Sequence, residues 1–273
     1  MLAPQEIRFA AREFPEATAT LDSVHPRQFA EMSDAALATL ALLFQDWEIG
    51  GECPATTQQV CTKLIPKPSG GRRPIGFFPA ALRLRGKARV RHAKEWQNTV
   101  AADPAVNVQA GRNIGDSMWR SMLRAQCGVK EGSIALDMLW DINKCFEQVC
   151  PKLLWHLARE LGYPLVLLRL SLRSYRWPRT LVMEEGLVAP PILAHQGIVA
   201  GSAMATFELT AYLLLALKSL KAKHPLSGLS LHIDDLMMMV QDSDPAEAAK
   251  RLVALGKDAV ELFEKGAPPS VCA

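Results

Sequence analysis

The run LSLHIDDLMMMVQ, residues 229–241, constrains the fold of this chain more than any other stretch. Two adjacent carboxylates, Asp234 and Asp235, stand in the middle of a segment whose neighbours favour burial. Two short apolar runs joined by polar residues are typical of two strands connected by a tight turn. Because a carboxylate out of water is costly without a cationic partner, we expect these aspartates to lie in the turn, beside a Lys or Arg, a metal ion or solvent.

The other patterns predict a mixed α+β fold, with an antiparallel sheet covered by helices. Residues 132–142 form a β-like run that ends on Asp141, and residues 62–80 form two extended pieces around a Ser-Gly-Gly turn. A second hairpin is expected around Glu-Glu-Gly in 179–193. Helices are expected over 33–47 with Ser33 as N-cap, 81–99, 201–223 with Ser202 as N-cap, and 245–264 with Asp244 as N-cap.

Three aspartates are the strongest candidates for chemistry. If the strand that ends on Asp141 neighbours the hairpin of Asp234 and Asp235, three carboxylates converge at one edge of the sheet. Such a cluster repels itself unless a divalent cation lies between its members, and hard oxygen ligands favour Mg²⁺. Two such ions would activate a hydroxyl nucleophile and hold a leaving pyrophosphate. A solvated turn is the alternative for an isolated Asp-Asp pair.

Positive charge is concentrated in one window. From Cys61 to Lys94 the chain has ten Lys or Arg and no Asp or Glu, although its formal net charge is only +3. Within this window Arg83, Lys87 and Arg91 recur every four residues and form a basic stripe on one helix face. We interpret the stripe, with Lys94, as a contact for a polyanion such as nucleic acid; a solvated helix face is the alternative.

Several segments resemble the motifs of reverse transcriptases. LWDINKCFEQV (139–149) resembles their first catalytic motif, an Asp followed five positions later by an aromatic residue, and HIDD (232–235) resembles the second. HQGIVAGSAMATFEL (195–209) resembles the Gln-Gly motif that opens the helix under the template. LIPKPSGGRRPIG (64–76) and AGRNIGD (110–116) resemble the fingers motifs of the group II intron and non-LTR retrotransposon branch. The five motifs follow the family's order, so the chain is similar to a reverse transcriptase fingers-and-palm segment.

The resemblance implies the architecture and the reaction. It implies right-hand polymerase fingers and palm, with an N-terminal helical segment at 1–60, fingers at 61–131, a catalytic palm at 132–273, and no thumb in the chain given. The implied activity is RNA-directed DNA synthesis, in which a primer 3′-OH attacks the α-phosphate of a dNTP. The implied partners are an RNA template with a DNA primer and a dNTP, and the implied cofactor is two Mg²⁺ ions or Mn²⁺ in their place.

The resemblance also implies residue roles. Asp141, Asp234 and Asp235 are the catalytic metal ligands, with the Ile142 carbonyl assisting. Phe146 excludes a ribose 2′-OH and so selects dNTPs. The remaining roles are dNTP binding by Lys67, Arg73, Gln196 and Gly197, and support of the fingers or template by Arg112. The chain departs from the family at His232, which replaces an aromatic residue, and at Gly201-Ser202, which replaces Ser-Pro.

Two other functions fit the same residues. The first is a catalytically inactive retroelement remnant that keeps nucleic-acid binding. The second is an RNA-copying palm polymerase, against which Phe146 argues.

The sequence does not indicate an oligomeric state. No apolar stretch is long enough to cross a bilayer, and six cysteines without metal-like spacing indicate reduced thiols, so we expect an intracellular protein without membrane contact.

Overall fold

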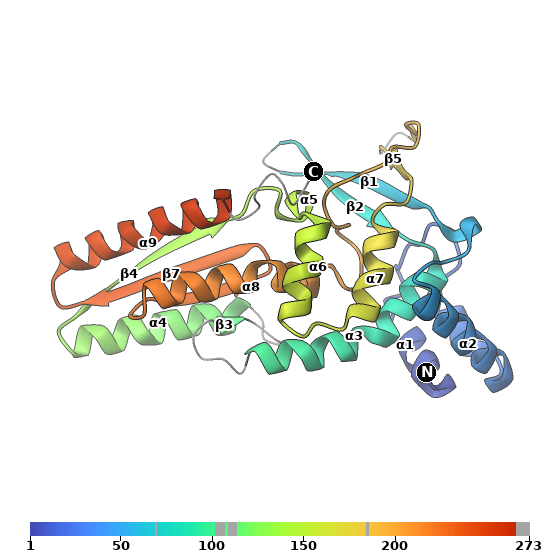
Figure 1. Cartoon of the computed structure of the whole chain (residues 1–273), viewed down its shortest axis with the longest axis horizontal. Coiled ribbons are helices and arrows are strands. Elements are labelled where there is room, and N and C mark those ends of the chain that lie inside the picture. The colour runs from blue at the N-terminus through green and yellow to red at the C-terminus, as the bar shows by residue number, and fades with distance from the viewer. Residues whose placement is uncertain (69, 102–106, 109–113, 184–185, 266–273) are drawn as a thin grey trace. The chain divides into compact units, whose positions relative to one another are not determined.

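A computed structural model describes residues 1–68, 70–101, 107–108, 114–183 and 186–265 of the chain (Figure 1). The fold is α+β, as predicted, with 54% helix and 16% strand. The chain divides into two compact units, each assembled from separate stretches. Unit 1 comprises Met1–Ala93, Phe146–Pro151 and Gly162–Glu208, and unit 2 comprises Lys94–Cys145, Lys152–Leu161 and the described part of Leu209–Ala273.

Unit 1 combines a small sheet with helices. Its strands have the order β2-β1-β5, with bounds β1 Val60–Pro66, β2 Arg72–Phe77 and β5 Arg179–Val182. Its helices are α1 Pro4–Arg12, α2 Asp34–Gly50, α7 Leu165–Ser174, and the short 3-10 turns η1 Pro26–Glu31 and η2 Ala55–Thr57. Four helices contribute residues to both units: α3 Ala80–Ala101, α5 Cys145–Gln148, α6 Pro151–Glu160 and α8 Ala205–Lys223.

The predicted basic hairpin is confirmed. Strands β1 and β2 are antiparallel, with Pro66 opposite Arg72 at the closed end. The predicted hairpin of 179–193 is also present in its described residues, where antiparallel bridges join Arg179 to Ile192 and Val182 to Val188. Strand β5 of that hairpin runs parallel to β1. Two segments that are more than one hundred residues apart therefore share one sheet.

The core of unit 1 contains a buried ion-pair cluster. Glu48 on α2 accepts hydrogen bonds from the guanidinium groups of Arg85, at 3.0 Å, and Arg89, at 2.8 and 2.6 Å, both on α3. Burial alone would raise the pKa of Glu48, but the hydrogen bond from Arg89 and the charge of Arg85 outweigh it and lower that pKa. Two of the ten cations in the basic window thus hold α3 against α2.

Unit 2 is built on a four-stranded sheet with the order β3-β6-β7-β4. The strands are β3 Asn107–Val108, β4 Ile134–Asp141, β6 Gly228–His232 and β7 Asp235–Asp242. Strand β7 is antiparallel to both β4 and β6, as predicted, whereas β3 runs parallel to β6. The helices that lie wholly in this unit, among its described residues, are α4 Ile114–Lys130 and α9 Pro245–Lys265. Asp244 caps α9 as expected, because its carboxylate accepts from Ala246 N at 2.9 Å.

Helices α4 and α9 contact opposite faces of strand β4 (Figure 1). On one face, Met138 and Trp140 lie within 3.2–3.6 Å of the position a Cβ would take at Gly256 of α9. On the other face, Asp137 accepts a hydrogen bond of 2.9 Å from Ser121 of α4. Because side chains alternate along a strand, the face that carries Asp137 is also the face that carries Asp141.

Two predictions need correction or extension. Helix α8 begins at Ala205 rather than 201, because Gly201 adopts a φ of +108° that is incompatible with a helix. Helix α7, absent from the prediction, fills the interval 165–174.

In the described residues, no helix combines the length and the apolar character that crossing a membrane requires. Cys53, Cys61, Cys127 and Cys145 are free thiols, whereas Cys150 is disulfide-bonded, contrary to the prediction.

Candidate functional site

The predicted Asp-Asp hairpin is present in unit 2. Strands β6 and β7 are joined by the two-residue turn of Ile233 and Asp234, and His232 lies opposite Asp235 at its closed end. Ile233 has a φ of 59°. A two-residue hairpin turn requires a positive φ in its first central residue, and glycine normally supplies it. A β-branched residue there is a genuine outlier, so the turn is held in a strained conformation.

Asp141 lies next to this turn. It is the last residue of β4 and stands directly opposite Asp235 in the antiparallel β4–β7 pair. Beyond that pair, Ile142 N donates a hydrogen bond of 3.1 Å to Asp234 O. Residues directly opposite one another on antiparallel strands have Cβ atoms roughly 4.5–5.5 Å apart and share a face. The backbone therefore brings all three predicted aspartates to one corner of the sheet.

This corner is open. Asp141 and Asp235 are exposed, and Leu139, two residues earlier on the same face, is 74% exposed. Helix α4 hydrogen-bonds this face at Asp137, four residues before Asp141. Two like charges directly opposite each other are destabilising. The open corner therefore presents negative charge that a cation or a ligand with cationic groups would neutralise.

The side chains themselves are not arranged as a complete metal site. Among the described residues, no three His, Cys, Asp or Glu side chains form a group that could hold a metal ion. The backbone positions nevertheless fit a divalent cation, because opposite carboxylates on one face can converge on an ion by changes of side-chain rotamer alone. The residues that could hold it are Asp141, Asp234 and Asp235.

In unit 1, the Gln-Gly segment is joined to the segment that follows the first aspartate. Gly197 N donates to Val149 O and Ile198 N donates to Phe146 O, both at 2.8 Å. The Gln196 side chain donates to Gln148 O at 3.1 Å. The structure therefore brings together three residues with a predicted role in dNTP binding: Phe146, Gln196 and Gly197.

A glycine is required at position 197 because the backbone of Glu147 approaches it closely. Its φ is +85°, and a Cβ at this position would lie 2.8 Å from Glu147 O. The resemblance implies that Gly197 binds the dNTP, whereas in the structure its close neighbour is the chain's own backbone. The glycine thus fixes the loop that presents Gln196 against the segment of Phe146.

We expect Gly197→Ala to lower the free energy of unfolding more than Gly162→Ala does. Both glycines have positive φ, but nothing lies within 4 Å of a Cβ at Gly162. The control therefore includes only the left-handed backbone cost of about 1–2 kcal/mol, and Gly197→Ala adds the backbone clash. Urea denaturation of the two variants measures the difference. Equal losses of stability would contradict a close-approach role for Gly197.

The predicted phosphate-binding cations are at the tip of the basic hairpin. Arg73 lies near the closed end of β2 and Lys67 directly follows β1, and both side chains are exposed. The turn closes through Lys67 N, which donates to Gly71 O at 3.1 Å. Both side chains can therefore reach an anion in solvent, and their role in binding a triphosphate stays a prediction.

The basic stripe contacts the N-terminal segment of the chain. Lys87 pairs with Glu13 at 3.2 Å, and Arg91 pairs with Glu6. Arg83 donates to Ala19 O and lies over the ring of Phe14, with 5.8 Å from Cζ to the ring centroid. These partners are distant in sequence, so the spacing of the stripe could not reveal them. Lys94, in unit 2, is exposed, and Arg112 lies outside the described residues.

Sequence reasoning missed a buried carboxyl in unit 1. Glu208 is fully buried and accepts a hydrogen bond of 2.5 Å from the hydroxyl of Tyr175. Burial raises the pKa of Glu208 to about 7, against the lowering effect of the Tyr175 hydrogen bond. Its position directly before the apolar run LTAYLLLAL was the only signal that the sequence offered.

No protein-family model matches the chain, and a search of curated proteins finds no match either. The main basis for proposing a function is therefore the geometry of the three aspartates.

Proposed function

We propose that this chain carries out template-directed nucleotidyl transfer of the reverse-transcriptase type, with unit 2 as the palm. The observation that supports this most directly is the register of β4 and β7, which sets Asp141 opposite Asp235 with Asp234 in the adjoining turn. The proposed palm chemistry requires carboxylates from two separate strands at one place. An Asp-Asp turn alone would not meet this requirement.

The strained turn supports the same proposal. A non-glycine residue with positive φ costs on the order of 1–3 kcal/mol, and such residues cluster at functional sites. Ile233 occupies this conformation between His232 and the two aspartates. This turn conformation, which the pairing of β6 with β7 imposes, places Asp234 at the tip of the hairpin, beside the position of Asp141.

The aspartates would supply the ligands for two divalent cations. When bound, such ions activate the primer hydroxyl and neutralise the leaving pyrophosphate. Asp141 and Asp235 would hold the ions from the two strands, and Asp234 from the turn, with the Ile142 carbonyl beside them. Lys67 and Arg73 would neutralise the charge of the incoming triphosphate.

A primer-extension assay tests the proposal. Full-length protein is incubated with poly(rA)/oligo(dT), labelled dTTP, and Mg²⁺ or Mn²⁺. Template-dependent incorporation of dTTP is the expected result, and DNA-templated or template-free addition would contradict the proposed specificity. No incorporation with either metal, at protein concentrations that saturate the substrate, would overturn the proposal.

One observation favours a second function, nucleic-acid binding without catalysis. The described side chains do not form a three-ligand metal group. A protein of this kind would bind the same poly(rA)/oligo(dT) duplex through its cations, with an affinity that falls steeply as salt rises. Salt-dependent binding together with absent incorporation would establish this alternative.

Nucleotide selection follows from Phe146. Its carbonyl accepts a hydrogen bond from Ile198 N, next to the Gln-Gly pair, so the backbone that carries the ring is held by a defined loop. We expect Phe146→Ala to raise the ratio of rNTP to dNTP incorporation by about 10- to 100-fold, because the bulk that excludes a 2′-OH is removed. Phe9→Ala, at a phenylalanine of α1 that is 66% exposed, is the matched control. A wild-type ratio in Phe146→Ala would contradict the predicted role of Phe146, and rNTP preference in the wild type would favour the RNA-copying polymerase.

A further inference from the structure

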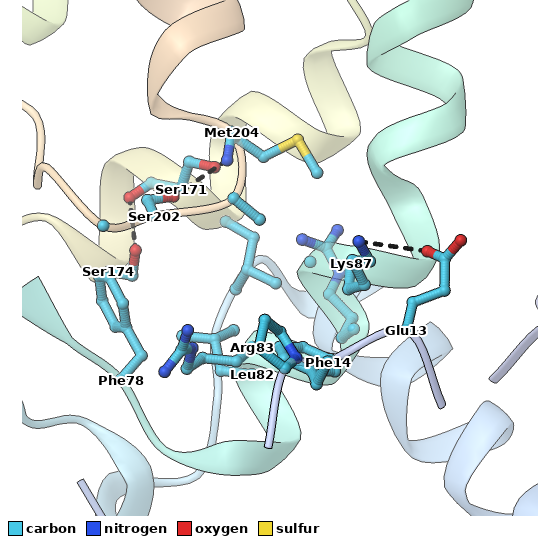
Figure 2. A pocket seen from close by; sticks show the side chains of 16 residues that line it. Glu13, Phe14, Phe78, Leu82, Arg83, Lys87, Ser171, Ser174, Ser202 and Met204 are labelled. Carbon is cyan, nitrogen blue, oxygen red and sulfur yellow. Dashed lines mark hydrogen bonds and ion pairs between the residues drawn. The ribbon is translucent and has the colours of Figure 1, made fainter. Parts of the chain in front are cut away.

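Unit 1 contains a cavity of about 250 Å³ that its own residues form (Figure 2). The walls come from the segment after α1, the start of α3, helix α7 and the loop before α8. Among the residues that line it, none belongs to those predicted to bind metal or the incoming nucleotide. The cavity is therefore a separate site from the three aspartates.

One wall of the cavity is apolar and buried. Phe14 is 6% exposed, and Leu82 lies close to it in Figure 2, whereas Phe78, 3% exposed, lies beside Ser174. Aromatic side chains bind flat apolar groups through stacked or edge-to-face contacts. This wall therefore suits a planar ring.

The opposite wall carries hydroxyl groups. Figure 2 shows Ser171, Ser174 and Ser202 together, across the cavity from Phe14 and Leu82. Ser171 and Ser174 are buried, and the Ser174 hydroxyl donates to Ser171 O at 2.8 Å. A hydroxyl that donates one hydrogen bond still has two acceptor lone pairs. This wall therefore suits a ring whose edge carries a hydrogen-bond donor that the Ser174 hydroxyl oxygen can accept.

The rim of the cavity carries a net positive charge. Figure 2 shows Lys87 next to Glu13, with which it pairs, and Arg83 nearer to Phe14 and Leu82. The Lys87 and Glu13 side chains are 36% and 44% exposed, so water screens their ion pair and an anion can replace Glu13 at little cost. The rim can thus take one phosphate next to a bound ring.

We propose that this cavity binds one unpaired nucleotide, with its base between the phenylalanine and serine walls and its phosphate at Arg83 and Lys87. The volume of about 250 Å³ is below the 300–1,000 Å³ typical of sites for whole drug-sized ligands, so a single heterocycle fits. Stacking on aromatic walls and cations that track phosphate are how proteins bind single-stranded nucleic acid. The nucleotide can be free or part of a single strand, and the inference does not depend on the aspartates.

The inference is tested by filling the cavity with a larger side chain and measuring ligand binding. Ala203 is exposed and lines the cavity, so Ala203→Phe fills the space without burying a new group in the core. Ala38→Phe, at an exposed alanine of α2 outside the lining, is the matched control. Binding to full-length protein is measured in the presence of EDTA. Fluorescence anisotropy is used for two strands, single-stranded U8 and an abasic strand of eight ribose phosphates. Calorimetry is used for UMP. Thermal unfolding of both variants checks the fold.

We expect Ala203→Phe to weaken U8 binding about tenfold and to leave binding of the abasic strand unchanged. Loss of UMP binding alone would identify a free nucleotide as the ligand, and loss of U8 binding alone would identify a single strand. Equal affinity of wild type and Ala203→Phe for both ligands, or equal weakening of U8 and the abasic strand, would overturn the inference. Base-dependent binding without primer extension would leave the inference standing and refute the proposed function.

Discussion

Asp141→Asn is expected to lower dTTP incorporation by about 10³-fold or more without loss of stability. The proposed reaction needs a charged oxygen ligand at this position, and removing a group that stabilises transition-state charge typically costs 10²–10³-fold in rate. Because Asp141 stands opposite Asp235, removing one of two like charges should leave the free energy of unfolding unchanged or raise it by up to about 1 kcal/mol. Asp234→Asn should lose activity to the same extent.

Asp137→Asn is the matched control. Asp137 lies on the same strand and the same face, four residues before Asp141, and accepts from Ser121. Its asparagine variant keeps an acceptor for that hydrogen bond and should keep wild-type incorporation. Primer extension gives the rates and urea denaturation without metal gives the stabilities. Wild-type incorporation by Asp141→Asn, or equal inactivation of Asp137→Asn, would exclude a specific role for Asp141.

Glu208→Gln is expected to remove a large pH dependence of stability. Burial raises the pKa of Glu208 from 4.5 to about 7 in the folded protein. Below pH 4.5 the carboxyl is protonated in both the folded and the unfolded protein, so it does not lower the free energy of unfolding. Between pH 4.5 and 7 the unfolded chain loses the proton while the folded protein keeps it, so the free energy of unfolding falls as pH rises. Above pH 7 the free energy of unfolding falls no further, and the total decrease is on the order of 3 kcal/mol.

Glutamine at this position stays neutral at every pH and keeps an oxygen that can accept from Tyr175. The variant should therefore be less pH-dependent than the wild type from pH 4.5 to 7 and more stable than it at pH 8. Glu31→Gln, at an exposed glutamate of unit 1, should retain the wild-type pH profile. Denaturant unfolding at half-unit pH steps measures the three profiles. Parallel profiles for wild type and Glu208→Gln would show that Glu208 does not titrate in this range.

Local features of the fold could be predicted from the sequence. The hairpins, the caps Ser33 and Asp244, and the strand that ends on Asp141 depend on residues within a few positions of one another. The placement of Asp141 beside Asp235 was predictable only as a condition on which strands are neighbours. The alternation of β4 and β7 is compatible with that pairing but does not specify it.

Long-range pairings could not be predicted. Strand β5 joins β1 across more than one hundred residues, and no local pattern identifies that neighbour. The same limit applies to the basic stripe, in which Lys87 and Arg91 have carboxylate partners in the N-terminal segment. Charge spacing identifies a helix face, whereas the partner of that face depends on the tertiary fold.

Binding of Mn²⁺, counted by electron paramagnetic resonance of full-length protein, tests the central claim most directly. The metal is spectroscopically visible, and the measurement needs neither template nor activity. If the three aspartates form a metal site, wild type and Asp137→Asn bind Mn²⁺ saturably, and Asp141→Asn loses that binding. No saturable binding by the wild type, or equal binding by wild type and Asp141→Asn, would contradict the site and with it the proposed function.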